Sequence, residues 1–317
     1  MQLFRLRVVI FLLCAAITSC RSEPHAAADP AHAPVVTLVG ISRVTEPFAK
    51  FFAARLPDMA FPVKPGSAGM LANVDYLQSG LADVTFTQSD IAYTALTKGT
   101  EANPGPHTSL RGLAVTWMVA LHLVVGPGID FHTLEDLRGK RIGVGLPGGG
   151  TGISAQIILA NAGLLSDVHL VSVTPSEVPS HLADGRIDAE IITGAYPADL
   201  VTAALATPGV RLVPIQGPGI AELKDKYPFL RPVIIPANTY GQAADIHTVG
   251  VDVLFVCRES LSEEIAYRML TAFFDGIQDL AQKQPVLRSV TLSQAPATPI
   301  PLHPGAARFY RERELFN

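Results

Sequence analysis

Short apolar, β-rich runs alternate with segments of helical spacing along most of the chain. This alternation of strand and helix is typical of α/β layers with mostly parallel strands, and we therefore predict an α/β fold. The predicted strands are residues 35–39, 61–64, 84–87, 112–115, 119–125, 141–144, 168–173, 189–193 and 249–256, and the predicted helices are residues 46–56, 70–79, 91–97, 152–162, 177–183, 197–206 and 262–281.

One pattern occurs twice. Leu77–Val84 and Leu182–Ala189 share Leu, Gly and Asp at the same spacing, and each leads through a β-rich run to a polar loop, residues 88–90 and 193–197. Ligands of open α/β sheets bind beyond the carboxyl ends of the strands. Two similar lobes that present such loops to each other would form a cleft. The order helix, glycine, strand is also common in chains without any repeat.

A glycine-rich segment, residues 143–152, joins a predicted strand to a helix. Its backbone N–H groups lie at a helix start, where anions are favoured. It is not a P-loop, since no Lys-Ser or Lys-Thr follows the glycines. Residues 143–148 formally match the dinucleotide fingerprint, but Pro147 and the extra glycines make the turn longer than that fingerprint needs. A connection that binds no ligand is the third interpretation.

Composition narrows the function classes. At 317 residues the chain is long enough for two lobes, and 48% hydrophobic against 16% charged residues allows large cores. The net charge is −4, there is one Trp, and no basic run occurs, so nucleic acid is not an expected partner. The sequence shows no spacing typical of a zinc site and no cluster of histidines. It also shows no Ser/His/Asp arrangement and no paired carboxylates that would indicate a catalytic site. We predict no metal, no cofactor and no enzyme activity.

The first residues indicate export. Arg5 and Arg7 precede the apolar run 8–17, which is too short to span a bilayer comfortably and predicts a signal peptide over residues 1–19. Residues 17–20 end in Cys20 and resemble the bacterial lipobox. We therefore predict lipidation of Cys20 and a flexible tether over residues 20–34, with ordinary cleavage as the alternative. Export also argues against the dinucleotide interpretation.

Three segments together resemble a known family. Leu77–Tyr93, Leu134–Gly163 and Pro301–Glu312 are similar to TAXI-type solute receptors, the extracytoplasmic binding subunits of TRAP transporters. The resemblance implies a two-lobed periplasmic binding protein of type II-like fold, with two doubly wound mixed sheets joined by a hinge that the chain crosses twice. It also implies a small solute such as glutamate or a related carboxylate. Val39–Thr45 stands where the family usually has a Thr-Gly-Gly-Thr-Gly-Gly loop, which leaves the ligand identity open.

This resemblance sets the predicted lobes, partners and location. Lobe 1 would comprise residues 35–121 and 249–317, and lobe 2 residues 122–248. The expected function is capture of a small anionic solute between the lobes for TRAP membrane permease subunits, by a periplasmic protein held to the membrane through its lipid. A ligand-sensing lipoprotein without a transport role and an exported α/β enzyme are the alternatives.

The candidate ligand-binding residues follow from the loops at the predicted strand ends. The glycine loop and the Thr151 hydroxyl would hold a solute carboxylate, neutral side chains of the opposite lobe would orient it, and Arg43 would pair with it unless it is an ordinary surface Arg. Thr45, Asp90 and Thr133 are expected to cap helical segments. Cys257 is expected to be buried, and His303 is expected to hold the C-terminal tail in place. Tyr196 either closes over the ligand or packs in the core. The full set is Arg43, Ser67, Gln88, Ser89, Gly148, Gly149, Gly150, Thr151, Gly152 and Tyr196.

Overall fold

The structure is a computed structural model that describes residues 33–66 and 69–315. The predicted signal peptide, Cys20 and nearly all of the predicted tether lie outside the described residues, and so does Ser67. Among the residues described, no helix is both long and apolar enough to cross a membrane.

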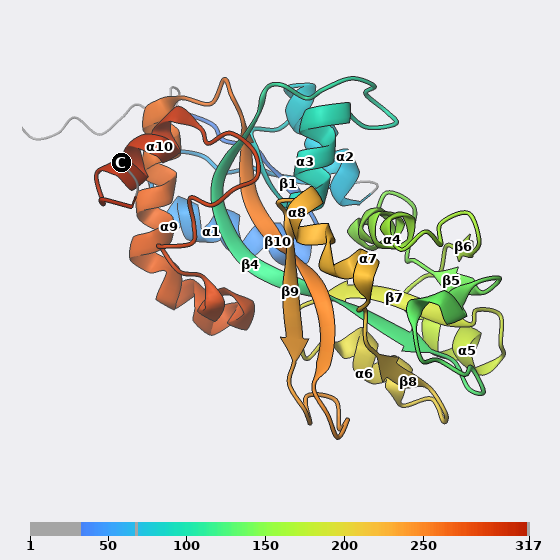
Figure 1. Ribbon diagram of the computed structural model, residues 1–317. Coiled ribbons are helices and arrows are strands. Elements are labelled where there is room, and N and C mark those ends of the chain that lie inside the picture. The colour runs from blue at the N-terminus through green and yellow to red at the C-terminus, as the bar shows by residue number, and fades with distance from the viewer. Residues whose placement is uncertain (1–32, 67–68, 316–317) are drawn as a thin grey trace, which may run out of the picture. The chain divides into compact units, whose positions relative to one another are not determined.

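The strands form one mixed sheet with the order β2-β1-β3-β10-β4-β7-β5-β6, while β8 pairs with β4 and β9 pairs with β10 (Figure 1). Within β2-β1-β3 and within β6-β5-β7 the strands are parallel, and β4 and β10 pair antiparallel with all of their neighbours. The strands are β1 (Leu38–Gly40), β2 (Val63–Pro65), β3 (Val84–Gln88), β4 (Leu110–Val125), β5 (Arg141–Gly143), β6 (His169–Val171), β7 (Ala189–Gly194), β8 (Arg211–Val213), β9 (Leu230–Ile235) and β10 (Ile246–Arg258).

Helices connect most of the strands, so the alternation predicted from the sequence is confirmed, and the fold is mixed α/β. Two short 3-10 turns, η2 (Leu134–Leu137) and η3 (Pro285–Ser289), accompany them; Thr133 caps the first through a capping box, as predicted. The helices are α1 (Ser42–Arg55), α2 (Met70–Gln78), α3 (Ser89–Lys98), α4 (Gly150–Asn161), α5 (Val178–Ala183), α6 (Asp199–Leu205), α7 (Pro218–Ala221), α8 (Leu223–Lys226), α9 (Glu263–Lys283) and α10 (Pro304–Arg311).

Two long strands link the two parallel parts of the sheet. From Leu110 to Ala120 strand β4 pairs with β10, and from Ala120 to Val125 it pairs with β7. Figure 1 shows β4 and β10 side by side, with α1 and α9 toward one end of this pair and α4 and α5 toward the other. We call residues 34–109 with their parallel strands the first half, and residues 126–229 the second half. The predicted division into lobes stays a prediction.

The repeated sequence pattern has the same structural role in both halves. Gly80 and Gly185 both have positive φ after a helix, at 68° and 62°, a conformation that glycine adopts without strain. Asp83 then accepts a hydrogen bond from the backbone N–H of Thr37 at 2.7 Å, just before β1. Asp188 accepts one from the N–H of Arg141 at 2.8 Å, at the start of β5. Each aspartate therefore ties the start of one strand to the strand that pairs with it.

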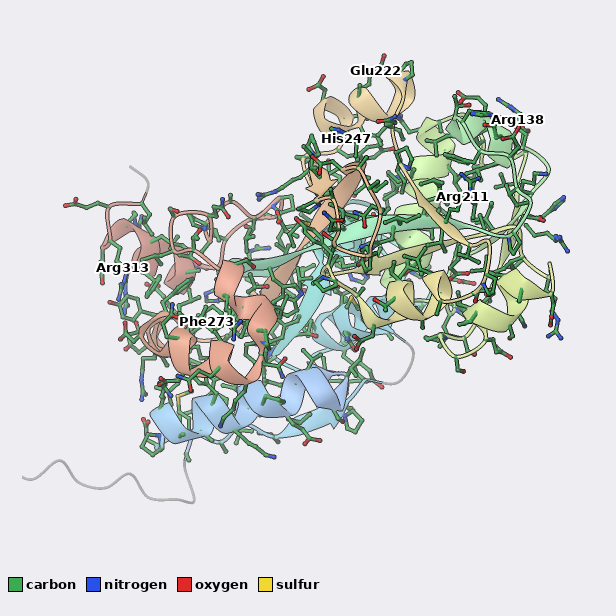
Figure 2. All side chains as sticks on the ribbon, turned by 90° about the horizontal axis from the view of Figure 1, so that it is seen from below. Arg138, Arg211, Glu222, His247, Phe273 and Arg313 are labelled. Atoms are coloured by element: carbon green, nitrogen blue, oxygen red, sulfur yellow. The ribbon has the colours of Figure 1, made fainter. Side chains whose placement is uncertain are left out.

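Aromatic rings fill the core between the sheet and helices α1 and α9. The Phe255 ring stacks on Phe86, with centroids 4.8 Å apart, and on Phe52 at 5.9 Å. Phe273 of α9 lies 6.4 Å from Phe255 and 6.3 Å from Phe48 of α1. Figure 2 shows α9, with Phe273 labelled, lying over α1. Residues of α9, near the C-terminal end of the chain, thus pack in the same core as residues of α1.

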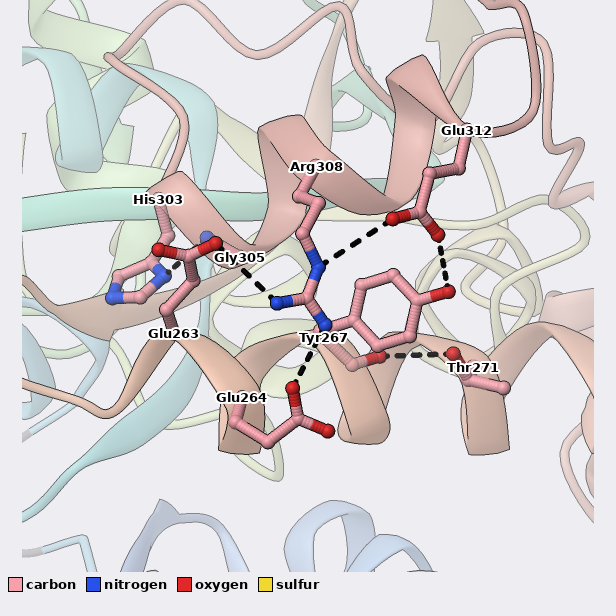
Figure 3. A network of polar contacts seen from close by, with 8 residues as sticks. All are labelled: Glu263, Glu264, Tyr267, Thr271, His303, Gly305, Arg308 and Glu312. Atoms are coloured by element: carbon pink, nitrogen blue, oxygen red, sulfur yellow. Dashed lines mark hydrogen bonds and ion pairs between the residues drawn. The ribbon is translucent and has the colours of Figure 1, made fainter.

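The C-terminal motif fixes α10 to the rest of the protein (Figure 3). The His303 Nδ1 accepts the N–H of Gly305 at 3.1 Å and thereby caps α10, so Nε2 carries the proton toward the Leu261 carbonyl at 3.0 Å. Burial lowers the pKa of His303, which favours this neutral tautomer. Arg308 bonds Glu264 at 2.8 Å. The expectation that His303 holds the tail down is confirmed.

Several predicted boundaries are wrong in an informative way. Helix α1 begins at Ser42 rather than Glu46 and contains Pro47, and Thr45 does not cap it but donates its hydroxyl to the Ile41 carbonyl at 3.0 Å. The predicted strands 112–115 and 119–125 are one strand, β4. Pro47 is the sixth residue of α1, and because proline has no N–H the helix lacks the hydrogen bond that residue 47 would donate to the preceding turn.

Candidate functional site

The glycine loop between β5 and α4 leaves the start of α4 open. Gly145 and Gly148 have φ of 73° and 72°. The N-cap of α4 is Gly149, which has no side chain that could accept a hydrogen bond from the first turn. The first N–H groups of a helix lack partners within the helix, and its N-terminus carries a partial positive charge. The predicted turn therefore exists, and helix α4 begins at Gly150, two residues earlier than expected.

Gln88 covers this helix start from the first half. A methyl group on Gly150 would overlap the Gln88 carboxamide. The Gln88 Nε2 lies 3.4 Å from the Thr193 hydroxyl, which is 2.7 Å from the hydroxyl of Thr151. The structure thus brings together Gln88 of β3, Gly150 and Thr151 of α4, and Thr193 of β7, as the two-loop argument from the sequence expected.

The start of α2 lies against the other side of the glycine loop. The N–H of Leu71 donates to the carbonyl oxygen of Gly148 at 3.3 Å. Gly69 has φ of 92°, and a methyl group on it would come within 2.5 Å of the same oxygen. Glycine is therefore required at both positions of this contact, and the two halves touch closely along the loop.

Among the residues described, three buried side-chain oxygen atoms of the first half have no hydrogen-bond partner in the protein. They are Asn73 Oδ1 of α2, and Thr87 Oγ1 and Gln88 Oε1 at the end of β3. A methyl group on Gly66, just after β2, would come within 2.7 Å of the Asn73 oxygen. Buried polar atoms normally have partners in the protein, in water or in a ligand. These atoms lie beside the carboxyl ends of β2 and β3 and are therefore candidates for contacting a ligand or an ordered water.

Ser89 and Asp90 reach the second half as well. The Ser89 hydroxyl donates to the Phe229 carbonyl at 3.4 Å, and the Ser154 hydroxyl of α4 donates to Asp90 at 2.5 Å. Burial raises the pKa of Asp90 to about 6, against the opposing effect of the Ser154 bond. The expectation that Asp90 is a helix cap is wrong, because the N-cap of α3 is Gln88 and Asp90 lies inside the first turn.

Glu190 lies beneath the glycine loop and was missed by the sequence argument. Its side chain is 2% exposed, and its Oε2 has no partner in the protein. A methyl group on Gly143 would overlap this carboxyl group. Burial raises the pKa of Glu190 to about 8, although a hydrogen bond from the Gly145 N–H opposes that shift. Glu190 therefore supports the loop from below as a neutral acid at pH 7.

This placement predicts a pH-dependent stability. The ordinary pKa of Glu190 is 4.5 and its pKa in the folded protein is about 8, so unfolding releases its proton between these values. The free energy of unfolding should fall as pH rises, by about 1.4 kcal/mol per pH unit in this window. Between pH 6.5 and 8 the wild-type protein should lose about 2 kcal/mol of its free energy of unfolding through this group, and Glu190→Gln should not show that loss. Urea unfolding at each pH measures the difference. Glu222→Gln, at an exposed acid, is the control, and parallel pH profiles for wild type and Glu190→Gln would contradict the prediction.

Two cavities adjoin the contact between the halves. The glycine-loop cavity, about 480 Å³, is lined by the loop itself and by residues of α2, α3, α4 and β6. The Trp117 cavity, also about 480 Å³, lies between α1, β4, the residues after β7, and η3. Its lining includes Val44 and Phe48 of α1, Trp117 of β4, Pro197 and Leu287. Among the residues described, no group of three His, Cys, Asp or Glu side chains could hold a metal ion.

The structure also places two further candidate ligand-binding residues, Tyr196 and Arg43, and two residues outside the candidate set, Cys257 and Trp117. Tyr196 packs with Ala120, Val233 and Ile235, so the structure gives it the packing role that was the alternative to ligand binding. Arg43 lies in the first turn of α1, but its side chain is outside the described part. Cys257 is buried, as expected, and burial raises its pKa. Trp117 was missed because nothing in its sequence neighbourhood shows which way a residue in an apolar run points.

A sequence model of the NMT1-like family matches residues 57–313. The chain belongs to the NMT1-like family. This is a periplasmic binding protein family, so membership implies a location outside the cytoplasm. The family therefore bears out the expected class of binding protein.

Two solved structures of one protein, with TM-scores above 0.5, agree on the fold. XAC2383 from Xanthomonas citri bound to ATP has a TM-score of 0.56 at 14% identity, with 88% of this chain and 94% of that chain covered. The same protein bound to chloride gives 0.55 at 12% identity, covering 88% and 95%. The aliphatic sulphonate binding protein SsuA from Escherichia coli matches with a TM-score of 0.46 at 15% identity, covering 90% and 94%.

Proposed function

We propose that this NMT1-like protein captures a small carboxylate or amino acid, glutamate-like in size, between its two halves and delivers it to a membrane permease. The observation that carries the proposal is the group of buried, unpartnered oxygens of Asn73, Thr87 and Gln88 beside a glycine loop that the opposite half touches. Hydrogen bonds join the two halves at this contact, from Leu71 to Gly148, from Ser89 to Phe229 and from Ser154 to Asp90.

The helix ends support an anionic ligand. Helices α1, α3 and α4 follow β1, β3 and β5, and none of their N-caps makes a side-chain hydrogen bond. Each start offers N–H groups and a partial positive charge, which favours an anion by about 0.3–1 kcal/mol per helix. Thr151 and Thr193 add neutral hydroxyl groups, which orient a solute without trapping it.

Binding without catalysis is part of the proposal. The two buried acids near the site, Asp90 and Glu190, contact Ser154 and the glycine loop, so both are occupied in holding the protein together. The motif of residues 88–93 and the ending of residues 301–306, both similar to TAXI receptors, support a TRAP-type permease as the recipient. Lipid anchoring through Cys20 is proposed on the sequence alone.

Arg43 tests the ligand class. A charged hydrogen bond from Arg to a carboxylate contributes about 1.5–3 kcal/mol, so Arg43→Ala should weaken binding about tenfold or more. Isothermal titration calorimetry against a panel of amino acids and dicarboxylates measures this, after mass spectrometry of ligand retained through native purification has guided the panel. Lys50→Ala removes an exposed cation from the same helix and should leave the affinity unchanged. Binding of neutral or cationic solutes alone would refute the carboxylate class.

A further inference from the structure

Most of the side chains that line the Trp117 cavity are apolar, and polar atoms share its exposed lining with them. Ala195, Pro197 and Ala198 line it from the second half, and Val44, Phe48 and Trp117 from the first-half side. Asp199 and Gln284 are the polar side chains of the lining, and no lysine or arginine is among the lining residues described. Its volume of about 480 Å³ is within the range of small-molecule sites.

A β-bulge places Trp117 in this wall. Met118 pairs with Asp252, but Val115 pairs with Leu254, so Thr116 and Trp117 of β4 lie opposite the single residue Val253. The Thr116 hydroxyl donates to the Val253 carbonyl at 2.5 Å and stabilises the irregularity. A bulge changes the direction of a side chain that regular pairing would point elsewhere, and bulges are common next to binding sites.

Trp117 is also held in position from behind. Its ring lies 5.6 Å from Phe86, which stacks on Phe255 at 4.8 Å and packs against Phe48 at 4.3 Å. The wall is therefore formed by rings that the core fixes before any solute arrives. A wall fixed in advance loses little side-chain entropy on binding, and aromatic faces suit apolar or aromatic groups.

The cavity is lined, on both halves, by residues that are close in sequence to the proposed carboxylate site. Val44 follows Arg43 in the first turn of α1, and Ala195 comes two residues after Thr193, which contacts Thr151 and Gln88. Asp199 disfavours a second carboxylate at this end. We infer that the solute carries an apolar group of about phenyl size beside its carboxylate and places that group against Trp117. This inference rests on the proposed function and narrows its substrate class.

Matched ligand pairs test it. Propionate and 3-phenylpropionate, and alanine and phenylalanine, share a carboxylate end and differ by one phenyl group. In calorimetry we expect the phenyl member of at least one pair to bind about tenfold more tightly or better, since burial of an aromatic ring is favourable. The chain has a single tryptophan, so the same phenyl compound should also change the protein's fluorescence, whereas its smaller partner should not.

Three variants separate a binding role from a structural one. Trp117→Ala should reduce the phenyl preference to about twofold or less, and Trp117→Phe should retain most of it. Ala195→Leu fills the cavity without removing a core ring and should also reduce the preference. Ile234→Ala, at a side chain that is 49% exposed and outside the cavity lining, is the control.

The outcomes distinguish this inference from the function on which it rests. Equal affinity for both members of each pair would overturn the apolar subsite and leave the proposed capture of carboxylates intact. A phenyl preference that survives both Trp117→Ala and Ala195→Leu would place the apolar group elsewhere and overturn it too. Failure of all four compounds, with no carboxylate found by mass spectrometry after native purification, would overturn the proposed ligand class together with this inference.

Discussion

Gly150→Val is expected to reduce solute affinity by about 100-fold or more. A single methyl group at Gly150 already overlaps the Gln88 carboxamide, and valine adds a second branch at the buried start of α4. The two halves then stay apart at the contact that brings Thr151 and Thr193 to the solute. A factor of 100 corresponds to about 2.8 kcal/mol, within the range of about 1–3 kcal/mol that overpacking of a closely packed site costs, and Gln88 is buried and has little room to move aside.

The glycine loop offers its own control for this experiment. A methyl group on Gly152 would have only the Val144 carbonyl within 4 Å, at 3.7 Å, so Gly152→Ala should bind normally. Adding Gln88→Ala to Gly150→Val should restore part of the affinity, because the overlapping carboxamide is then gone. A double-mutant cycle by calorimetry measures this coupling. Wild-type affinity in Gly150→Val would show that closure over α4 is not needed for binding.

Phe255→Ala should cost about 3–5 kcal/mol of the free energy of unfolding, the usual range for an aromatic ring removed from a core. Phe255 is fully buried and stacks with Phe52 and Phe86. Urea unfolding followed by circular dichroism gives the free energy directly. Because Phe86 backs Trp117, the fluorescence of the folded variant should change as well.

The stability loss at Phe255 needs comparison with a surface position. Ile234→Ala removes an apolar side chain that is 49% exposed, and we expect it to change the free energy of unfolding by less than about 0.5 kcal/mol. A loss at Phe255 no larger than this would show that the stacked rings do not act as one core. It would also remove the argument that the Trp117 wall is fixed in advance.

Features of the fold that depend only on residues close in sequence were predictable. The glycine bend before α4 and the paired positions of Asp83 and Asp188 follow from backbone freedom and strand spacing within a few residues. They were predictable because neither depends on a distant partner. The fold class followed from the same alternation, and the family resemblance then supplied the kind of binding protein.

Features that depend on distant pairing were not predictable. Trp117 points into a cavity because β4 bulges against β10, a strand that comes more than a hundred residues later in the chain. Asp90 was taken for a cap since its partner, Ser154, lies on another helix. Tyr196 packs on β9 and β4 residues that its own neighbourhood does not reveal. Each of these features concerns a side chain whose neighbours are set by the sheet or by a distant helix rather than by the local sequence.

The position of β10 has a consequence for how the chain is made. This strand, residues 246–258, lies between β3 and β4 in the sheet, so a newly synthesised chain has both of those strand edges open until its last quarter is available. Open edges are templates for pairing with other chains. Export in an unfolded form, with folding delayed until the whole chain has emerged, would spare the protein that hazard. A polypeptide that ends before Ile246 would lack β10, so the edges of β3 and β4 would stay open.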